Sequence, residues 1–232
     1  MKLNAQRLLF VALSGMSMLA NAATITDGFT FSVASSGNQV GTHFHSSTGG
    51  EFGNPAGKAE VGRFFTEEVR GLSEYNLTGL TAASQAFVTF NVYQLAGLFK
   101  GANDFPFTGT ITVDAYAGNN LENISDFHAA SLGSVGSFST AALTSTSVLS
   151  FDITSLYNAA ISSGATSLGI RLMASPLNAT GAVTFQNFRL TTDNQSTVSG
   201  NVPEPETWAL VPAGLLVAGA CLRGKRKATV SA

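Results

Sequence analysis

Short stretches of alternating apolar and polar residues, separated by glycine, asparagine and serine, fill the middle of this 232-residue sequence. A period of two places successive side chains on opposite faces of a strand, and the separating residues favour turns. The stretches are 24–33, 70–77, 84–95, 108–117, 148–153, 167–174 and 182–190. Many short strands at this spacing predict an all-β fold, specifically an antiparallel β-sandwich.

One segment has helical spacing instead. The apolar residues Leu156 and Ala160 are four positions apart, so they lie on one face of a helix. We expect a single short helix here, capped by Thr154 or Ser155 and ended by Gly164.

The first 22 residues have the three-part layout of a secretory signal peptide. Two basic residues precede an apolar stretch over 8–19, and small residues follow it. We expect signal peptidase to recognise Ala20 and Ala22 and to cut before Ala23.

A second apolar segment, 208–222, lies near the C-terminus and contains no charged residue. A helix of this length covers roughly 23 Å, whereas a bilayer has a hydrocarbon core of about 30 Å, so it spans a membrane only with help from its flanks. The alternative is a buried core helix with a solvated basic tail, but the segment has no polar face, which favours a membrane span. Four basic residues follow it and predict a cytoplasmic C-terminus: Arg223, Lys225, Arg226 and Lys227.

The triplet Pro203-Glu204-Pro205 stands just before this segment. Two prolines fix φ and remove amide donors, so the triplet stays extended outside the membrane. Triplet, apolar segment and basic cluster together resemble the PEP-CTERM sorting signal of Gram-negative bacteria. The resemblance implies that an exosortase, a membrane-embedded cysteine transpeptidase or protease, recognises the triplet, and that the basic cluster stops translocation. It also implies an association with exopolysaccharide and biofilm.

These signals divide the chain into a signal peptide (1–22), a β-sandwich (23–192), a flexible tether (193–201) and a sorting signal (202–227). Within the domain, the glycine-rich stretch 37–62 is expected to be a long loop with one embedded strand. Pieces such as "GTITVDAYAGNN" and "LSFDITSLYNAAISSGATSLGIRL" resemble secreted jelly-roll domains, including carbohydrate-binding modules. That second resemblance implies a jelly-roll-like sandwich.

Charge is sparse and unevenly placed. Between residues 23 and 200, six basic and twelve acidic residues leave a net charge of −6. Phosphate binding needs clustered lysine and arginine, so nucleic acid is not an expected partner. Cys221 is the only cysteine, which excludes an intramolecular disulfide.

The sequence carries no motif of a hydrolase, metalloprotease or phosphate-binding loop, so we expect no enzyme and no cofactor. The acidic pair Glu67 and Glu68 would point to opposite faces of a strand, so we interpret it as solvated surface charge rather than as a glycosidase pair. Asp114, Asp126 and Asp152 could bind a structural calcium ion. Asp152 is more simply a turn or cap residue.

Two histidines raise the question of a metal site. His43 and His45 would face the same side of a strand and could bind zinc together with Glu51 or His128. We favour two surface histidines in a polar loop and predict no metal site.

We therefore expect an exported, non-catalytic protein, held in the inner membrane with its C-terminus in the cytoplasm and then delivered to the cell surface or extracellular matrix. Its expected partners are signal peptidase, an exosortase, the membrane and exopolysaccharide. The alternative is a polysaccharide-binding or polysaccharide-cleaving domain that uses exposed aromatic side chains, for which Tyr93, Tyr116 and Phe127 are candidates.

Overall fold

The structure, a computed structural model, describes residues 23–36, 39–49 and 54–198. Within these residues the chain is all-β with one α-helix, as the sequence predicts. The strands are β1 (Thr24–Asp27), β2 (Phe29–Ser36), β3 (Gln39–His45), β4 (Lys58–Phe64), β5 (Glu67–Asn76), β6 (Phe87–Gln94), β7 (Thr110–Tyr116), β8 (Ser131–Ser139), β9 (Val148–Asp152), β10 (Ser167–Ser175) and β11 (Gly181–Thr191). The helix α1 is Thr154–Ser162, and the 3-10 helices η2 and η3 are Ile124–His128 and Thr140–Ala142.

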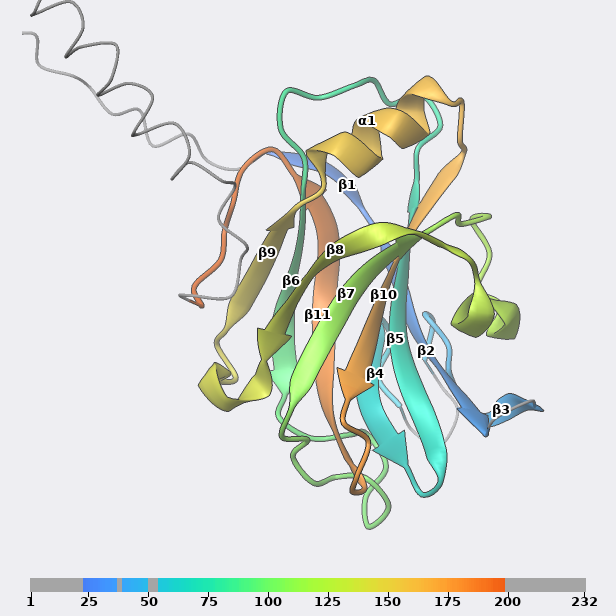
Figure 1. The fold of residues 1–232 in the computed structure, drawn as a ribbon, viewed down its shortest axis with the longest axis vertical. Helices are drawn as coiled ribbons and strands as arrows, with labels where there is room; N and C mark the ends of the chain where they lie inside the picture. Colours follow the sequence, from blue (N-terminus) through green and yellow to red (C-terminus); the bar gives the residue numbers. More distant parts are fainter. Residues whose placement is uncertain (1–22, 37–38, 50–53, 199–232) are drawn as a thin grey trace, which may run out of the picture.

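Eight strands form a continuous antiparallel path in the order β8-β7-β10-β5-β4-β11-β6-β9. β1 adds to β11, β2 adds to β5, and β3 adds to β2. The sheet curls until its end strands β8 and β9 approach each other, so it nearly closes into a barrel (Figure 1). α1 lies across one end of this barrel, and the turn between β4 and β5 lies at the other (Figure 1).

β5 is the strand at which the sheet turns. Its register pairs it first with β4, near their shared turn, and then with β10 along the same edge. β2 pairs along the opposite edge. The stretch from 37 to 62, expected to be a long loop with one embedded strand, contains β3 as that strand and also the start of β4, so the expectation is confirmed in part.

Apolar side chains that alternate along the strands fill the interior. Val88, Phe90 and Val92 on β6 are all buried there, as the period-two pattern predicts. Phe90 stacks on Phe188 with 4.6 Å between ring centroids and meets Phe185 edge-on. Aromatic pairs of this kind add about 0.5–1.5 kcal/mol each beyond the area they bury.

A second, smaller apolar cluster covers the outer face of β5 and its neighbours. It joins Phe31 and Val33 of β2, Leu72 of β5, Tyr116 of β7 and Phe127 of η2. These strands are therefore buried on both faces in part of their length, which places polar residues of their outer face out of reach of solvent.

The start of α1 differs from its predicted cap. Its cap residue is Ile153, and no side chain caps the helix. Thr154 Oγ1 instead accepts the N–H of Ala86 at 2.9 Å and ties the helix to β6. Asp152 Oδ1 accepts the N–H of Thr154 at 2.8 Å, which confirms Asp152 as a turn residue.

The end of α1 is the predicted one. Gly164 has φ of +73°, a left-handed conformation that suits glycine. Its N–H donates to the carbonyl of Ile161, and the N–H of Ala165 donates to the carbonyl of Ala160, both at 3.0 Å. This pair of bonds is a Schellman motif, which satisfies the last helical carbonyls.

The start of the described domain lies beside the end of β11. The N–H of Ala23 donates to Thr192 Oγ1 at 3.2 Å, and the N–H of Thr192 donates to the carbonyl of Ala23 at 3.0 Å. Beyond Thr192 the chain still packs, because Thr197 donates to the carbonyl of Val148 at 2.9 Å and Val198 rests on the main core. The packed domain thus extends into the segment expected to be a tether.

Candidate functional site

The sorting signal and most of the signal peptidase site lie outside the residues that the structure describes. This applies to Pro203, Glu204, Pro205, Arg223, Lys225, Arg226, Lys227, Ala20 and Ala22. Ala23 is described and exposed at the start of the domain. Among the described helices, none is long and apolar enough to cross a membrane, and the segment 208–222 is not among them.

His45 is not the surface histidine that we expected. It is 2% exposed in β3, and its Nε2 lies 3.4 Å from Oε2 of the fully buried Glu60. Glu60 also accepts the N–H of Leu98 at 2.5 Å and a hydrogen bond from Asn103 Nδ2. This buried carboxylate therefore fixes the loop after β6 against β3 and β4, a structural role that sequence reasoning missed.

Of the other residues of the zinc hypothesis, only His128 has a described side chain, and it does not join His45. His128 is exposed on η2 with its ring against Phe127, while Glu51 and the side chain of His43 lie outside the described residues. In the described part of the chain, no group of three or more histidine, cysteine, aspartate or glutamate residues could hold a metal ion.

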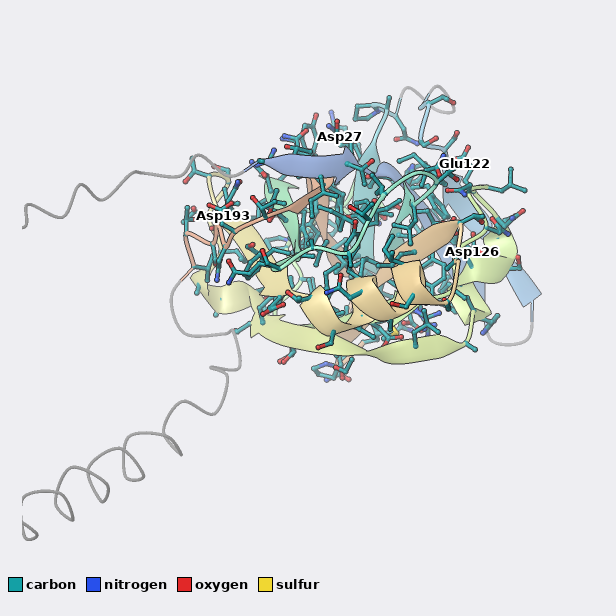
Figure 2. All side chains as sticks on the ribbon, turned by 90° about the horizontal axis from the view of Figure 1, so that it is seen from above. Asp27, Glu122, Asp126 and Asp193 are labelled. Carbon is teal, nitrogen blue, oxygen red and sulfur yellow. The ribbon has the colours of Figure 1, made fainter. Side chains whose placement is uncertain are left out.

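The three aspartates of the calcium hypothesis have separate partners. Asp114 pairs with Arg171, Asp126 accepts the N–H of Asn123 at 3.0 Å at the start of η2, and Asp152 lies at the start of α1. Figure 2 shows Asp193 on the opposite side of the domain from Glu122 and Asp126.

Arg171 organises a buried polar network on the outer face of β7 and β10. Its Nη2 donates to Asp114 Oδ2 at 2.8 Å, and its Nη1 donates to the carbonyls of Asp126, Phe127 and Ala129 at the end of η2. The contacts of Nη1 hold η2 against the sheet. The buried Nε of Arg171 has no hydrogen-bond partner among the described residues, whereas both terminal nitrogens bond to protein groups and stabilise the fold.

Glu74 plays a similar part beside it. The side chain is fully buried and accepts hydrogen bonds from Tyr116 Oη at 3.2 Å, Ser167 Oγ at 2.9 Å, and the N–H groups of Asn119 and Asn120 at 2.9 and 2.7 Å. Its two oxygens therefore anchor the loop after β7. Burial, followed by the charge of Glu74, raises the pKa of Tyr116 far above its usual range.

The acidic pair Glu67 and Glu68 is only partly the solvated charge that we expected. Glu68 binds Arg70 through both oxygens at 2.8 and 3.1 Å at a half-buried position. Glu67 is 6% exposed, so the interpretation of this residue as solvated charge is wrong.

Of the three candidate aromatic side chains, one is accessible. Tyr116 and Phe127 are buried in the second apolar cluster, so they cannot meet a polysaccharide, and their proposed role as exposed aromatics is wrong. Tyr93 at the end of β6 is 38% exposed.

Tyr93 lies next to Lys58, which lines a hollow in the surface of the described domain. β4 pairs with β11 up to Gln186, and β1 pairs with β11 from Arg189, so Asn187 and Phe188 lie between these two ladders. At this gap Gly28 leads from β1 into β2, and its N–H donates to the carbonyl of Phe188 at 2.9 Å. A side chain at Gly28 would come within 2.3 Å of Ser73 Oγ, so only glycine fits.

The gap opens as a hollow of about 380 Å³, bounded by Asp27, Lys58, Asn187 and Arg189, which we name the β11 hollow. Ligand pockets usually begin near 300 Å³, so it has room for a small ligand or one unit of a polymer. Figure 2 shows Asp27 on the side of the domain that carries β1.

A bulge in β11 shapes this hollow. The register between β11 and β6 shifts between Gln186 and Arg189. Phe188 turns inward onto Phe90, and Asn187 is exposed with φ of +57°. Asparagine tolerates the left-handed region better than most residues, and bulges often redirect side chains at functional sites.

Two cations line the hollow. Lys58 Nζ donates to Gln186 Oε1 at 2.6 Å and lies 4.2 Å from the centre of the Tyr93 ring. Partial burial lowers the pKa of Lys58. Arg189 stands opposite Asp27 in the ladder between β11 and β1. The hollow thus combines two positive groups, one carboxylate and an aromatic rim.

A smaller hollow of about 180 Å³ lies between the loops before β7 and after β10. Its lining includes Pro106, Phe107 and Pro176 and no charged side chain. Within the described residues, the β11 hollow is the better candidate for a polar ligand.

No protein-family model matches the chain, and no curated protein sequence matches it. Fold and geometry define an all-β domain with a polar, partly cationic hollow on one face.

Proposed function

We propose that this chain is an exported, non-catalytic protein of the cell surface or extracellular matrix, delivered by an exosortase and associated with exopolysaccharide. The observation that carries the proposal is the order of elements after Asn201: the triplet 203–205, the apolar segment 208–222 and the basic cluster 223–227. A signal peptide over 1–22 would route the domain through the inner membrane, with signal peptidase acting before Ala23.

The ends of the domain support this route. Ala23 and Thr192 are hydrogen-bonded neighbours, so the start of the domain lies beside the end of β11, and the chain then packs against β9 as far as Val198. The domain can therefore fold as one unit while the tail is held in a membrane and processed.

A jelly-roll-like sandwich is the finer fold that we propose. Along one edge, β5 pairs first with β4 and then with β10. The sheet therefore divides into two halves that face each other across the main core. This arrangement is compatible with two packed antiparallel sheets.

The buried carboxylates favour a non-catalytic domain. Glu74 is saturated by four donors from the fold, and Asp114 is paired with Arg171. The β11 hollow contributes a single carboxylate, Asp27, whereas glycoside cleavage ordinarily uses two acids facing one cleft. Among the alternatives, polysaccharide binding is therefore favoured over cleavage.

The test is fractionation of the epitope-tagged chain in a host with an exosortase. Replacing the triplet by Pro203→Ala, Glu204→Gln and Pro205→Ala should leave the chain unprocessed in the inner membrane. The matched control is Glu206→Gln with Thr207→Ala, directly after the triplet, which should be processed normally. Identical size and location of the triplet variant and the control would refute the sorting role.

A further inference from the structure

We infer that the β11 hollow binds a carboxylate-bearing sugar unit of a polysaccharide, with Lys58 and Arg189 facing the carboxylate and Tyr93 packing against the sugar ring. This inference rests on the proposed function, because it names the class of ligand that a matrix-associated domain would hold. Three features of the described residues support it: the two cations that line the hollow, the gap and bulge along β11 that form it, and the aromatic side chain at its rim.

The hollow is lined by two cations that have uncharged hydrogen-bond partners. Arg70 and Arg171 are paired with the carboxylates of Glu68 and Asp114. Arg63 donates to the carbonyl of Leu177 at 2.6 Å, away from the hollow. Lys100 is exposed and does not line the hollow.

Lys58 and Arg189 both line the hollow, and each donates to an uncharged glutamine oxygen, Gln186 Oε1 at 2.6 Å and Gln195 Oε1 at 3.0 Å. A guanidinium and an ammonium in one small site match an isolated carboxylate, because charge-assisted hydrogen bonds to carboxylates are among the strongest polar contacts. Two cations are too few for a nucleic acid, whose binding needs many phosphate contacts.

The hollow is a built feature of the sheet. It exists because β4 and β1 leave a gap along β11, because Gly28 lets the chain cross closely over Ser73, and because a bulge turns Asn187 outward. A non-glycine residue held at φ of +57° costs free energy, and such positions cluster at binding sites. Asn187 and Asp27 supply amide and carboxylate groups that can bond to sugar hydroxyls.

The rim supplies an apolar contact. Tyr93 is 38% exposed, and Lys58 Nζ lies 4.2 Å from the centre of its ring. A fixed aromatic face offers a large contact area with little loss of side-chain entropy, and a sugar ring presents a comparable apolar face of C–H groups. An open site of this kind suits one unit within a long chain better than a small molecule that must be enclosed.

The test is calorimetric titration of the full-length chain in detergent with three probes: an oligogalacturonate, its methyl-esterified form, and polyglutamate. We expect binding to the oligogalacturonate and affinity for the ester that is weaker by about tenfold or more, because esterification removes the carboxylate and keeps the ring. Polyglutamate has carboxylates without sugar rings and should bind no better than the ester. No binding to the oligogalacturonate, or equal binding to all three probes, would overturn the inference.

Variants locate the site. Arg189→Gln and Tyr93→Ala should each weaken oligogalacturonate binding by about tenfold, while Lys100→Gln, an exposed cation outside the hollow, should leave it unchanged. Each variant's melting temperature is compared with that of the parent. Because Tyr93 is on the surface, Tyr93→Ala remains informative if Arg189→Gln fails to fold. Equal losses in Lys100→Gln and Arg189→Gln would show that general charge, and not the hollow, binds the probe.

The two proposals fail separately. A chain that reaches the cell surface normally but does not bind oligogalacturonate contradicts the inference about the hollow alone. A chain that binds the probe but stays unprocessed in cells with an exosortase contradicts the sorting proposal alone.

Discussion

Arg171 on β10 and Asp114 on β7 stand directly opposite each other in the sheet, and their side chains form a buried ion pair of 2.8 Å. The pair lies on the outer face of β7 and β10, which points away from the main core. η2 and the second apolar cluster cover that face, so the charges serve to hold η2 in place.

Breaking this ion pair should lower the free energy of unfolding. Asp114→Asn leaves a buried guanidinium without its counter-charge, and we expect a loss of about 3 kcal/mol in the free energy of unfolding. Urea unfolding measures it. Glu68→Gln is the control, because its ion pair with Arg70 is partly solvated and should be worth less than about 1 kcal/mol. Equal losses in the two variants would contradict a special role for the buried pair.

Glu74 should control the order of the loop after β7. Glu74→Gln keeps the shape but turns one acceptor into a donor facing other donors, so we expect a loss of about 2 kcal/mol. Amide hydrogen exchange should report it locally, with reduced protection at Asn119 and Asn120, whose N–H groups bond to Glu74. Unchanged protection at both amides would mean that other contacts hold the loop.

Asp126 should make stability depend on pH. Burial raises its pKa to about 6, against 3.8 for the ordinary group. Between these values the folded state holds a proton that the unfolded chain has lost, so stability falls as pH rises through this window. We expect a contribution of about 1 kcal/mol after solvent screening. Urea unfolding at both ends of the window measures it, and Asp126→Asn should lack this part of the slope. A variant as pH-dependent as the parent would refute the assignment.

Asn187 should be replaceable by glycine but not by a branched residue. Asn187→Gly relieves the cost of φ at +57° and should change the free energy of unfolding by less than about 1 kcal/mol. Asn187→Val should destabilise the fold by about 1–2 kcal/mol, because a β-branched side chain is strongly disfavoured there. Thermal melts of the two variants decide the matter, and a melt of the valine variant equal to that of the parent would show that the bulge is not strained.

Sequence reasoning succeeds where one face of a strand is apolar. β6 shows the period-two pattern clearly, and Val88, Phe90 and Val92 lie in the core as predicted. The same reasoning fails where a strand is buried on both faces or has few buried residues, because the alternation of apolar and polar residues is then lost. β4 is hidden by Glu60, a fully buried charge that interrupts an apolar pattern. β8 is hidden because Phe138 is the one buried residue of its nine and glycine interrupts it.

The β11 hollow could not be predicted for another reason. Lys58 and Gln186 are 128 positions apart in sequence and meet only through the register of β4 on β11. Tyr93 was named as a candidate from its residue type alone, and the same reasoning also selected Tyr116 and Phe127, which are buried. The bulge at Asn187 could not be predicted, because a single sequence does not show where the register between two strands shifts.

The meeting of Ala23 and Thr192 has a mechanical consequence. The last three residues of β11 are Arg189 to Thr191, and they lead away from the hollow. They are bonded to β1 along one edge and to β6 along the other. A pull between a ligand in the hollow and an anchor beyond the C-terminal end would act lengthwise along β11. The contact between Thr197 and Val148 would take up the force first, and the ladder bonds on both edges of β11 would then share it in shear.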